Sequence, residues 1–254
     1  MKTWFVNKDS IVRKIWGKAD TVLFIFAGAA AEFALNKAVD WLYFTGKLPA
    51  DPLGRLFSTV TYSRKIIFSE METAMQAIDQ ITAIHTAVEK NRNAQIPDWA
   101  YRDVLFLLID YSIRSFELLE RKLSGAEKAE VFHVFYSVGK QMRLNGLPLT
   151  YEEYCVMRSE HLQQNLISSE FTIDLYRQYK KHLGPTRYVV LQQVQLMLVP
   201  GAVKKLLLPQ KTAIIRPFLL IYKLLKFFKL EGIFKNALLP ATYKEQVRKL
   251  ETAN

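Results

Sequence analysis

The sequence predicts an all-α fold, organised as a single domain of many helices. Apolar residues recur at steps of three and four along most of the chain, and no segment sustains the period-two alternation of a strand. Proline and glycine are sparse, with 9 and 10 residues, and most of them lie between segments that are too long for ordinary strands. Hydrophobic residue types make up 50% of the 254 residues, which is enough to bury a sizeable core.

Pro and Gly positions and helix-capping motifs divide this domain into helices. Ser124 with Glu127 has the spacing of a capping box, in which hydroxyl and carboxylate each satisfy a backbone donor, and Thr150 with Glu153 repeats it. The run 104–109 is apolar all round, so its helix should be central. The predicted helices span about residues 9–17, 20–45, 53–68, 70–91, 98–121, 125–144, 151–165, 168–182 and 186–198, with several short ones after 201.

Three segments of the chain differ in character. Residues 1–24 predict a basic N-terminal helix, and residues 25–200 predict the main helical domain. Residues 201–254 predict basic amphipathic helices that pack either on that domain or on a membrane.

The charge of the chain favours anionic partners. Lys and Arg number 35 against 24 Asp and Glu, a formal net charge of +11. Towards the C-terminus the basic residues alternate with aliphatic and aromatic runs, whereas nucleic-acid binders more often interleave them with Ser, Gly and Asn. We therefore expect an anionic membrane surface or a lipid-like ligand, and no nucleic acid. The segment Ile214–Leu230 would suit a helix in a lipid interface, with packing on the domain core as the alternative.

The cysteine count, the lengths of the apolar runs and the N-terminal sequence indicate where in the cell the protein is located. Cys155 is the only cysteine, so no intrachain disulfide can form. The longest apolar run, Thr21–Ala31, is shorter than the roughly 20 residues that span a bilayer, and it predicts a buried core helix. The N-terminus lacks the pattern of a signal peptide. These features predict a cytoplasmic protein that is at most peripheral at the membrane.

His85 lies on the apolar face of the segment 70–91 and should point inward. The positions that recur at helical spacing on this face are Met71, Ala74, Met75, Ile78, Ile81, His85 and Val88. One interpretation is a core histidine that hydrogen-bonds a backbone carbonyl. The other is a metal or haem ligand, a role that neutral imidazole often takes.

Arg55 and Thr59 are four residues apart and so share one face of the helix predicted over 53–68. If they face inward, the pair needs a polar partner such as a bound anion, a propionate or dioxygen. A solvated face is the alternative.

Other polar residues are expected to be structural. Asp110, at the end of the central apolar run, needs a partner, and Arg114 one turn later is the expected one. The sequence shows no catalytic Ser/His/Asp signature, phosphate-binding glycine loop or Cys/His zinc spacing. The remaining histidines are interpreted as surface or core residues: His133, His161 and His182.

An ordered set of motifs resembles the MpaB and latex-clearing oxygenase family. In that family an Asp-Pro is followed by an Arg and a Thr, then by a His before a small residue and a Val, and then by further helix-start and capping motifs. The set covers roughly residues 25–165, and its order is more specific than any one motif. The matching segments are Asp51-Pro-Leu-Gly-Arg55-Leu-Phe-Ser-Thr59, Ile84-His85-Thr86-Ala87-Val88, Ile96-Pro97-Asp98, Leu123-Ser-Gly-Ala-Glu127, Gly139-Lys-Gln-Met142 and Leu147-Pro-Leu-Thr-Tyr-Glu-Glu153.

The resemblance implies a haem-dependent oxygenase. It places haem b in a pocket between the central helices, with His85 as the proximal iron ligand. Arg55 and Thr59 would lie on the distal side as catalytic and cofactor-binding residues, with Ser58 beside them. The implied partners are dioxygen and an apolar substrate of isoprenoid or lipid-like character.

Two positions depart from the family pattern and keep other functions open. Latex-clearing proteins have a Lys that can cap the iron just before the motif Thr, where this chain has Ser58. Many members carry Trp-Val-His in the central helix, where this chain reads Asp103-Val104-Leu105. The alternatives are a non-catalytic haem carrier or sensor, and a haem-free helical module that binds lipid or a protein partner.

Overall fold

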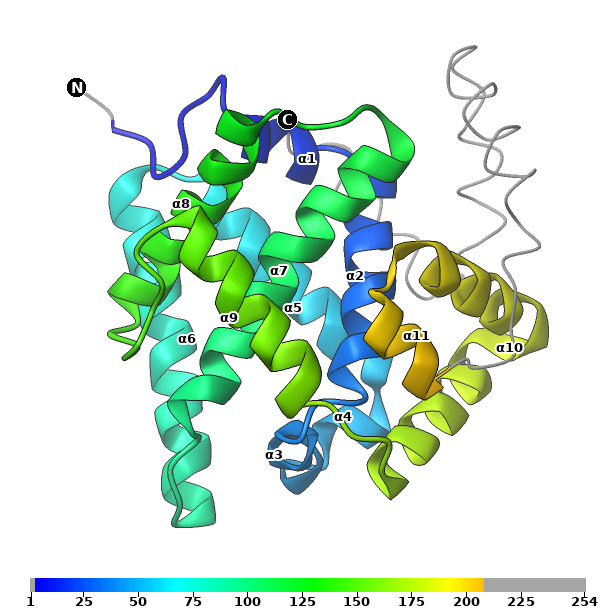
Figure 1. Ribbon diagram of the computed structural model, residues 1–254. Helices are drawn as coiled ribbons and strands as arrows, with labels where there is room; N and C mark the ends of the chain where they lie inside the picture. The colour runs from blue at the N-terminus through cyan, green and yellow to red at the C-terminus, as the bar shows by residue number, and fades with distance from the viewer. Residues whose placement is uncertain (1–2, 208–254) are drawn as a thin grey trace.

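A computed structural model describes residues 3–207, and this part of the chain is all-helical, as predicted (Figure 1). Residues 3–207 contain no strand, only the isolated bridges Trp4–Glu70 and Asn36–Leu166. The helices are α1 (Ile11–Trp16), α2 (Ala19–Phe33), α3 (Val39–Phe44), α4 (Lys47–Ala50), α5 (Pro52–Phe68), α6 (Met71–Arg92), α7 (Asp98–Leu119), α8 (Gly125–Gln141), α9 (Tyr151–Gln164), α10 (Glu170–Leu198) and α11 (Gly201–Leu207).

Helices α2 and α7 form the centre of the molecule and pack along each other (Figure 1). Residues 105–109 of α7 are all buried, as predicted for the run 104–109, whereas Val104 at its start is 37% exposed. The contact is close at Gly28, where an added Cβ would lie 2.3 Å from Cδ1 of Tyr111. A glycine is therefore needed on α2 at this crossing. The side chain of Trp16 from α1 is also fully buried, so α1 belongs to the same core.

The prediction of one continuous helix over 20–45 is wrong, because α2 ends at Phe33 and a separate helix, α3, begins at Val39. The buried side chain of Asn36 provides the reason. Its Oδ1 accepts from the backbone N–H of Ala38 at 2.8 Å, and its Nδ2 donates to Asp103 at 3.2 Å. An Asn that bonds its own backbone competes with helical hydrogen bonds, so the chain turns here before α3 begins.

Other helix boundaries lie where the sequence predicts them. The capping box of Ser124 and Glu127 is present at the start of α8, and the Thr150 side chain caps α9. In α10 the backbone leaves the helical region at Gly184, whose φ is 74°. Beyond this point α10 doubles back, because Tyr176 donates to Gln195 at 2.9 Å although a straight helix would separate them by about 28 Å.

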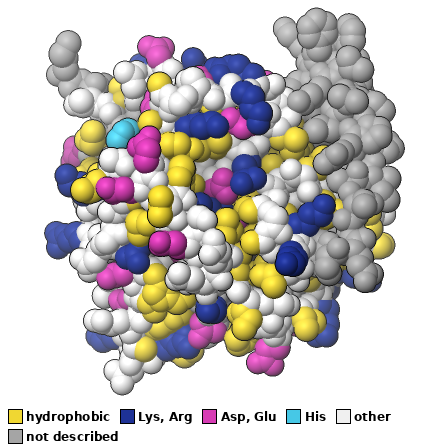
Figure 2. Space-filling view, viewed as in Figure 1, with side chains coloured by type: hydrophobic (Ala, Val, Ile, Leu, Met, Phe, Trp, Pro, Cys, Tyr) yellow, Lys and Arg dark blue, Asp and Glu magenta, His cyan; other side chains and the backbone are white. Residues whose placement is uncertain are grey.

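The surface of the described part mixes all types of side chain. Figure 2 shows acidic and basic groups interspersed with hydrophobic ones on the face that it draws. Among residues 3–207, no helix is both long and apolar enough to cross a membrane. The predicted interfacial segment Ile214–Leu230 lies outside the described residues, so its placement stays a prediction.

Candidate functional site

Helices α5 and α6 carry the residues predicted to form a site, and they pack against each other. The Asp51 side chain caps α5 by accepting from the N–H of Gly54 at 2.8 Å, with Pro52 at the first helical position. This start fixes the turn of α5 on which Arg55 lies.

Arg55 and Thr59 form a hydrogen-bonded pair on one face of α5. Nη1 of Arg55 donates to Oγ1 of Thr59 at 3.1 Å, and that hydroxyl donates to the Arg55 carbonyl at 3.3 Å. The Arg55 side chain is half-buried, and burial lowers its pKa. Ser58 is exposed. The spacing therefore pairs the first two residues as expected and leaves Ser58 apart from them.

His85 is half-buried on α6, and its buried Nδ1 has no hydrogen-bond partner within residues 3–207. Burial and the charge of Arg55 lower the pKa of His85 to about 4, against the opposing charge of Glu89. The imidazole is therefore neutral near pH 7 and keeps a lone pair. The ring of Tyr101, on α7, meets it edge-on with ring centroids 5.1 Å apart. Among residues 3–207, no backbone carbonyl accepts a hydrogen bond from His85, in contrast to the interpretation of His85 as a core histidine.

The apolar face predicted for α6 is buried only in its first half. Ala74, Ala77 and Ile78 are buried, whereas Met71 is 39% exposed. From Ile81 onward the face is half-buried, because the second half of α6 lies at the edge of the molecule (Figure 1). His85 thus sits between packed core and surface.

The donor chemistry at His85 fits a metal or haem iron. A neutral imidazole is the required ligand form, and a buried ring nitrogen without a partner is costly unless something else satisfies it. Arg55 supplies a nearby cation for an anionic group. Within residues 3–207, no group of three or more His, Cys, Asp or Glu side chains could hold a metal by itself.

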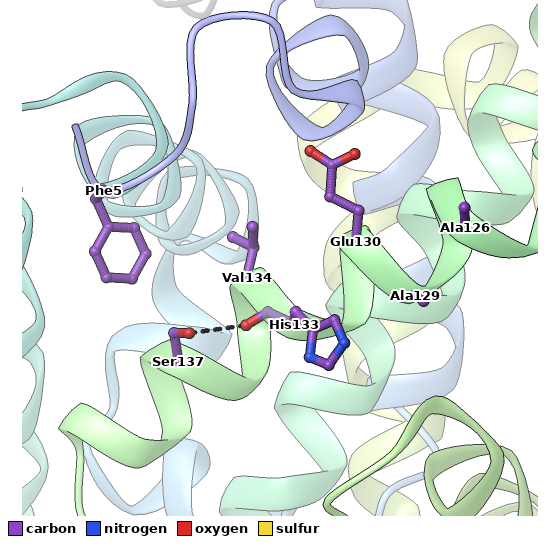
Figure 3. A pocket seen from close by; sticks show the side chains of 7 residues that line it. All are labelled: Phe5, Ala126, Ala129, Glu130, His133, Val134 and Ser137. Carbon is purple, nitrogen blue, oxygen red and sulfur yellow. Dashed lines mark hydrogen bonds between the residues drawn. The ribbon is translucent and has the colours of Figure 1, made fainter. Parts of the chain in front are cut away.

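Two cavities within residues 3–207 lie elsewhere. The larger, about 440 Å³, is a shallow groove between the N-terminal segment and α8, shown in Figure 3. It is lined by Phe5, Ala126, Ala129, Glu130, His133, Val134 and Ser137. The smaller, about 10 Å³, lies between α7 and α8. Neither includes Arg55, Thr59 or His85, so the predicted haem pocket between central helices is not seen in these cavities.

A buried polar network, which sequence reasoning missed, joins α2, α7 and α9. Arg158 donates to both carboxylate oxygens of Glu32 and, at 2.9 Å, to Asp110. His161 lies between two carboxylates, with Nε2 at 2.8 Å from Glu32 and Nδ1 at 2.7 Å from Asp103. The predicted pair of Asp110 with Arg114 is present at 2.8 Å, and further donors to this network are Tyr111, Asn36 and Asn165.

Neighbouring groups of opposite charge offset the effect of burial on the pKa values of Glu32 and His161. Burial alone would raise the pKa of Glu32, but Arg158 and His161 lower it to about 2. Burial would lower the pKa of His161, but Asp103 and Glu32 raise it. The carboxylates of Glu32, Asp103 and Asp110 thus lie against the basic side chains of Arg158, Arg114 and His161. The sequence signal was Glu32 itself, a charge beside a long apolar run that needs a buried partner.

Comparison with known proteins identifies the family. A sequence model described as the catalytic domain of the ER-bound oxygenase mpaB/B′ and rubber oxygenase matches residues 13–225, which is most of the chain. Neither a search of curated proteins nor one of solved structures found a match. The match extends well beyond the motifs around Arg55 and His85 and confirms the resemblance read from them. The chain belongs to the MpaB and rubber oxygenase catalytic-domain family.

Proposed function

We propose that the protein is a haem-dependent oxygenase with His85 as the proximal iron ligand. The observation that carries this proposal is the neutral imidazole of His85, whose buried Nδ1 lacks a partner and which lies within electrostatic reach of Arg55. Such an imidazole is ready to ligate iron, because no proton has to leave it first. Membership of an oxygenase family supports the same reaction class.

Arg55 and Thr59 would serve the distal side of the site. The guanidinium of Arg55 can donate to a haem propionate or to an anionic oxygen, and its bond to Thr59 fixes its direction. Ser58 is too short to cap the iron as a lysine could, which leaves that position open to dioxygen. A bound haem supplies the redox chemistry, and the protein orients it and excludes water.

The substrate class we propose is an apolar, isoprenoid or lipid-like molecule. Half-buried and exposed aliphatic side chains flank His85 on α6, with Ile84 47% exposed. A substrate of this kind would reach such a surface from a membrane, which agrees with the basic, apolar composition of the C-terminal segment.

An absorption spectrum with two matched variants tests the haem proposal. Protein expressed with adequate haem supply should show a Soret band, and His85→Ala should largely abolish it. His133→Ala, which removes an exposed histidine on α8, should leave the band unchanged. A folded, colourless wild type would refute the proposal in favour of a haem-free module. A wild type with a Soret band that consumes no dioxygen with any apolar substrate would support the carrier alternative.

A further inference from the structure

Glu89 lies one helical turn after His85 on α6 and is anchored from the next helix. Its Oε1 accepts from the hydroxyl of Tyr101 at 3.2 Å and from the backbone N–H of Ile96 at 2.9 Å. The same Tyr101 side chain that donates its hydroxyl to this carboxylate packs its ring edge-on against His85. One aromatic side chain therefore touches the imidazole and fixes the carboxylate beside it.

Two hydrogen-bonding groups in this cluster are left open. Nδ1 of His85 has no partner, and both hydrogen bonds found for the Glu89 carboxylate within residues 3–207 fall on Oε1. Residues four apart on a helix are neighbours, so Glu89 and His85 lie on the same face of α6. The charge of Glu89 acts on His85 and opposes the lowering of its pKa, so the second carboxylate oxygen is an acceptor available to a ring N–H of His85.

We propose that Glu89 and Tyr101 are positioning residues for His85, with Glu89 accepting the N–H of whichever ring nitrogen does not bind the metal. Histidines that ligate metals almost always donate their other N–H to a carboxylate, a carbonyl or water, which fixes the tautomer and raises the basicity of the ligand. Here Glu89 supplies the acceptor, and Tyr101 holds both the carboxylate and the ring plane. The inference rests on the proposed function, because it assigns a role at the same site.

The two residues should contribute in different ways. Glu89→Gln keeps the size of the side chain and a neutral acceptor but removes the negative charge. It should weaken haem binding by about 10–100-fold, the usual effect of losing a partner of a ligating histidine. It should also raise the reduction potential of the iron, since a less basic imidazole stabilises the ferric state less. Tyr101→Phe keeps the ring against His85 and removes one of the two hydrogen bonds that anchor the carboxylate, so its effect should be intermediate.

Hemin titration of the full-length protein, with redox potentiometry of the loaded forms, tests this inference. Glu72→Gln is the matched control, because it removes an exposed carboxylate from the first turn of the same helix. Circular dichroism checks that every variant is folded. Weaker hemin binding and a raised potential for Glu89→Gln, with Glu72→Gln unchanged, would support the inference.

Two other outcomes separate this inference from the proposed function. If the wild type binds hemin and Glu89→Gln matches it in both affinity and potential, the role of Glu89 is refuted while the haem proposal stands. If the folded wild type binds no hemin, both are refuted. A loss of affinity in Glu89→Gln without a change in potential would indicate a purely structural residue and would also overturn the inference.

Discussion

Glu32→Gln is predicted to destabilise the protein more than any surface substitution. Glu32 is fully buried and takes hydrogen bonds from Arg158 and Tyr111 as well as the contact with His161. An amide would leave Arg158 with Asp110 as its only carboxylate partner and would turn an N–H group towards a guanidinium. Breaking a buried ion pair from one side costs about 3–5 kcal/mol. That is a large share of the roughly 5–15 kcal/mol by which a domain is stable.

Urea unfolding followed by circular dichroism measures this cost. With a slope of about 3 kcal/mol per molar urea, a loss of about 3–5 kcal/mol lowers the midpoint by about 1–2 M. Glu72→Gln provides the control for an exposed carboxylate and should stay within about 0.5 kcal/mol of wild type. A Glu32→Gln midpoint within about 0.3 M of wild type would show that the network contributes little, and the reasoning above would be refuted.

Four further outcomes follow from the structure. The pKa of His161 is raised in the folded state above the roughly 6.5 of an unfolded chain, so its contribution is fully present below about pH 6.5 and is lost as pH rises through the folded pKa. The free energy of unfolding should therefore fall on the alkaline side, and His161→Gln should flatten that fall. Arg55→Ala should cost about 1.5–3 kcal/mol of haem-binding free energy in a hemin titration while leaving the circular dichroism unchanged, and an unaltered affinity would contradict its distal role. Gly28→Ala pushes a methyl group into the ring of Tyr111 and should cost about 1–3 kcal/mol in thermal or urea unfolding. The full chain should co-sediment with anionic vesicles at low salt and less so above 0.1 M, where the screening length is about 10 Å, whereas a chain truncated before 214 should stay in the supernatant.

Features set by neighbouring residues were predictable from the sequence. The start of α8 depends on Ser124 and Glu127, which lie three residues apart, so the pattern alone indicates the cap. The pairing of Arg55 with Thr59 follows in the same way from helical spacing. The family motif was likewise visible, because its residues keep their order along the chain.

Features set by distant residues were not predictable. The end of α2 depends on the contact of Asn36 with Asp103, 67 positions away. The position of His161 between two carboxylates depends on how α2, α7 and α9 meet, which no local pattern encodes. The open Nδ1 of His85 was also hidden, since periodicity shows only that the residue faces inward and leaves its partners undetermined.

The buried network has a consequence for how the chain folds. Glu32 and Arg158 are 126 residues apart, so their contact cannot form until α2 and α9 have met. The buried residues of α9 are Tyr154, Arg158 and His161, so ionic contacts hold this helix together with the aromatic packing of Tyr154. Detaching α9 alone would leave Glu32 inside the protein without its counter-charge, which makes partial opening costly. The amide hydrogens of α9 should therefore exchange with solvent only when the whole domain opens, unlike those of a typical peripheral helix.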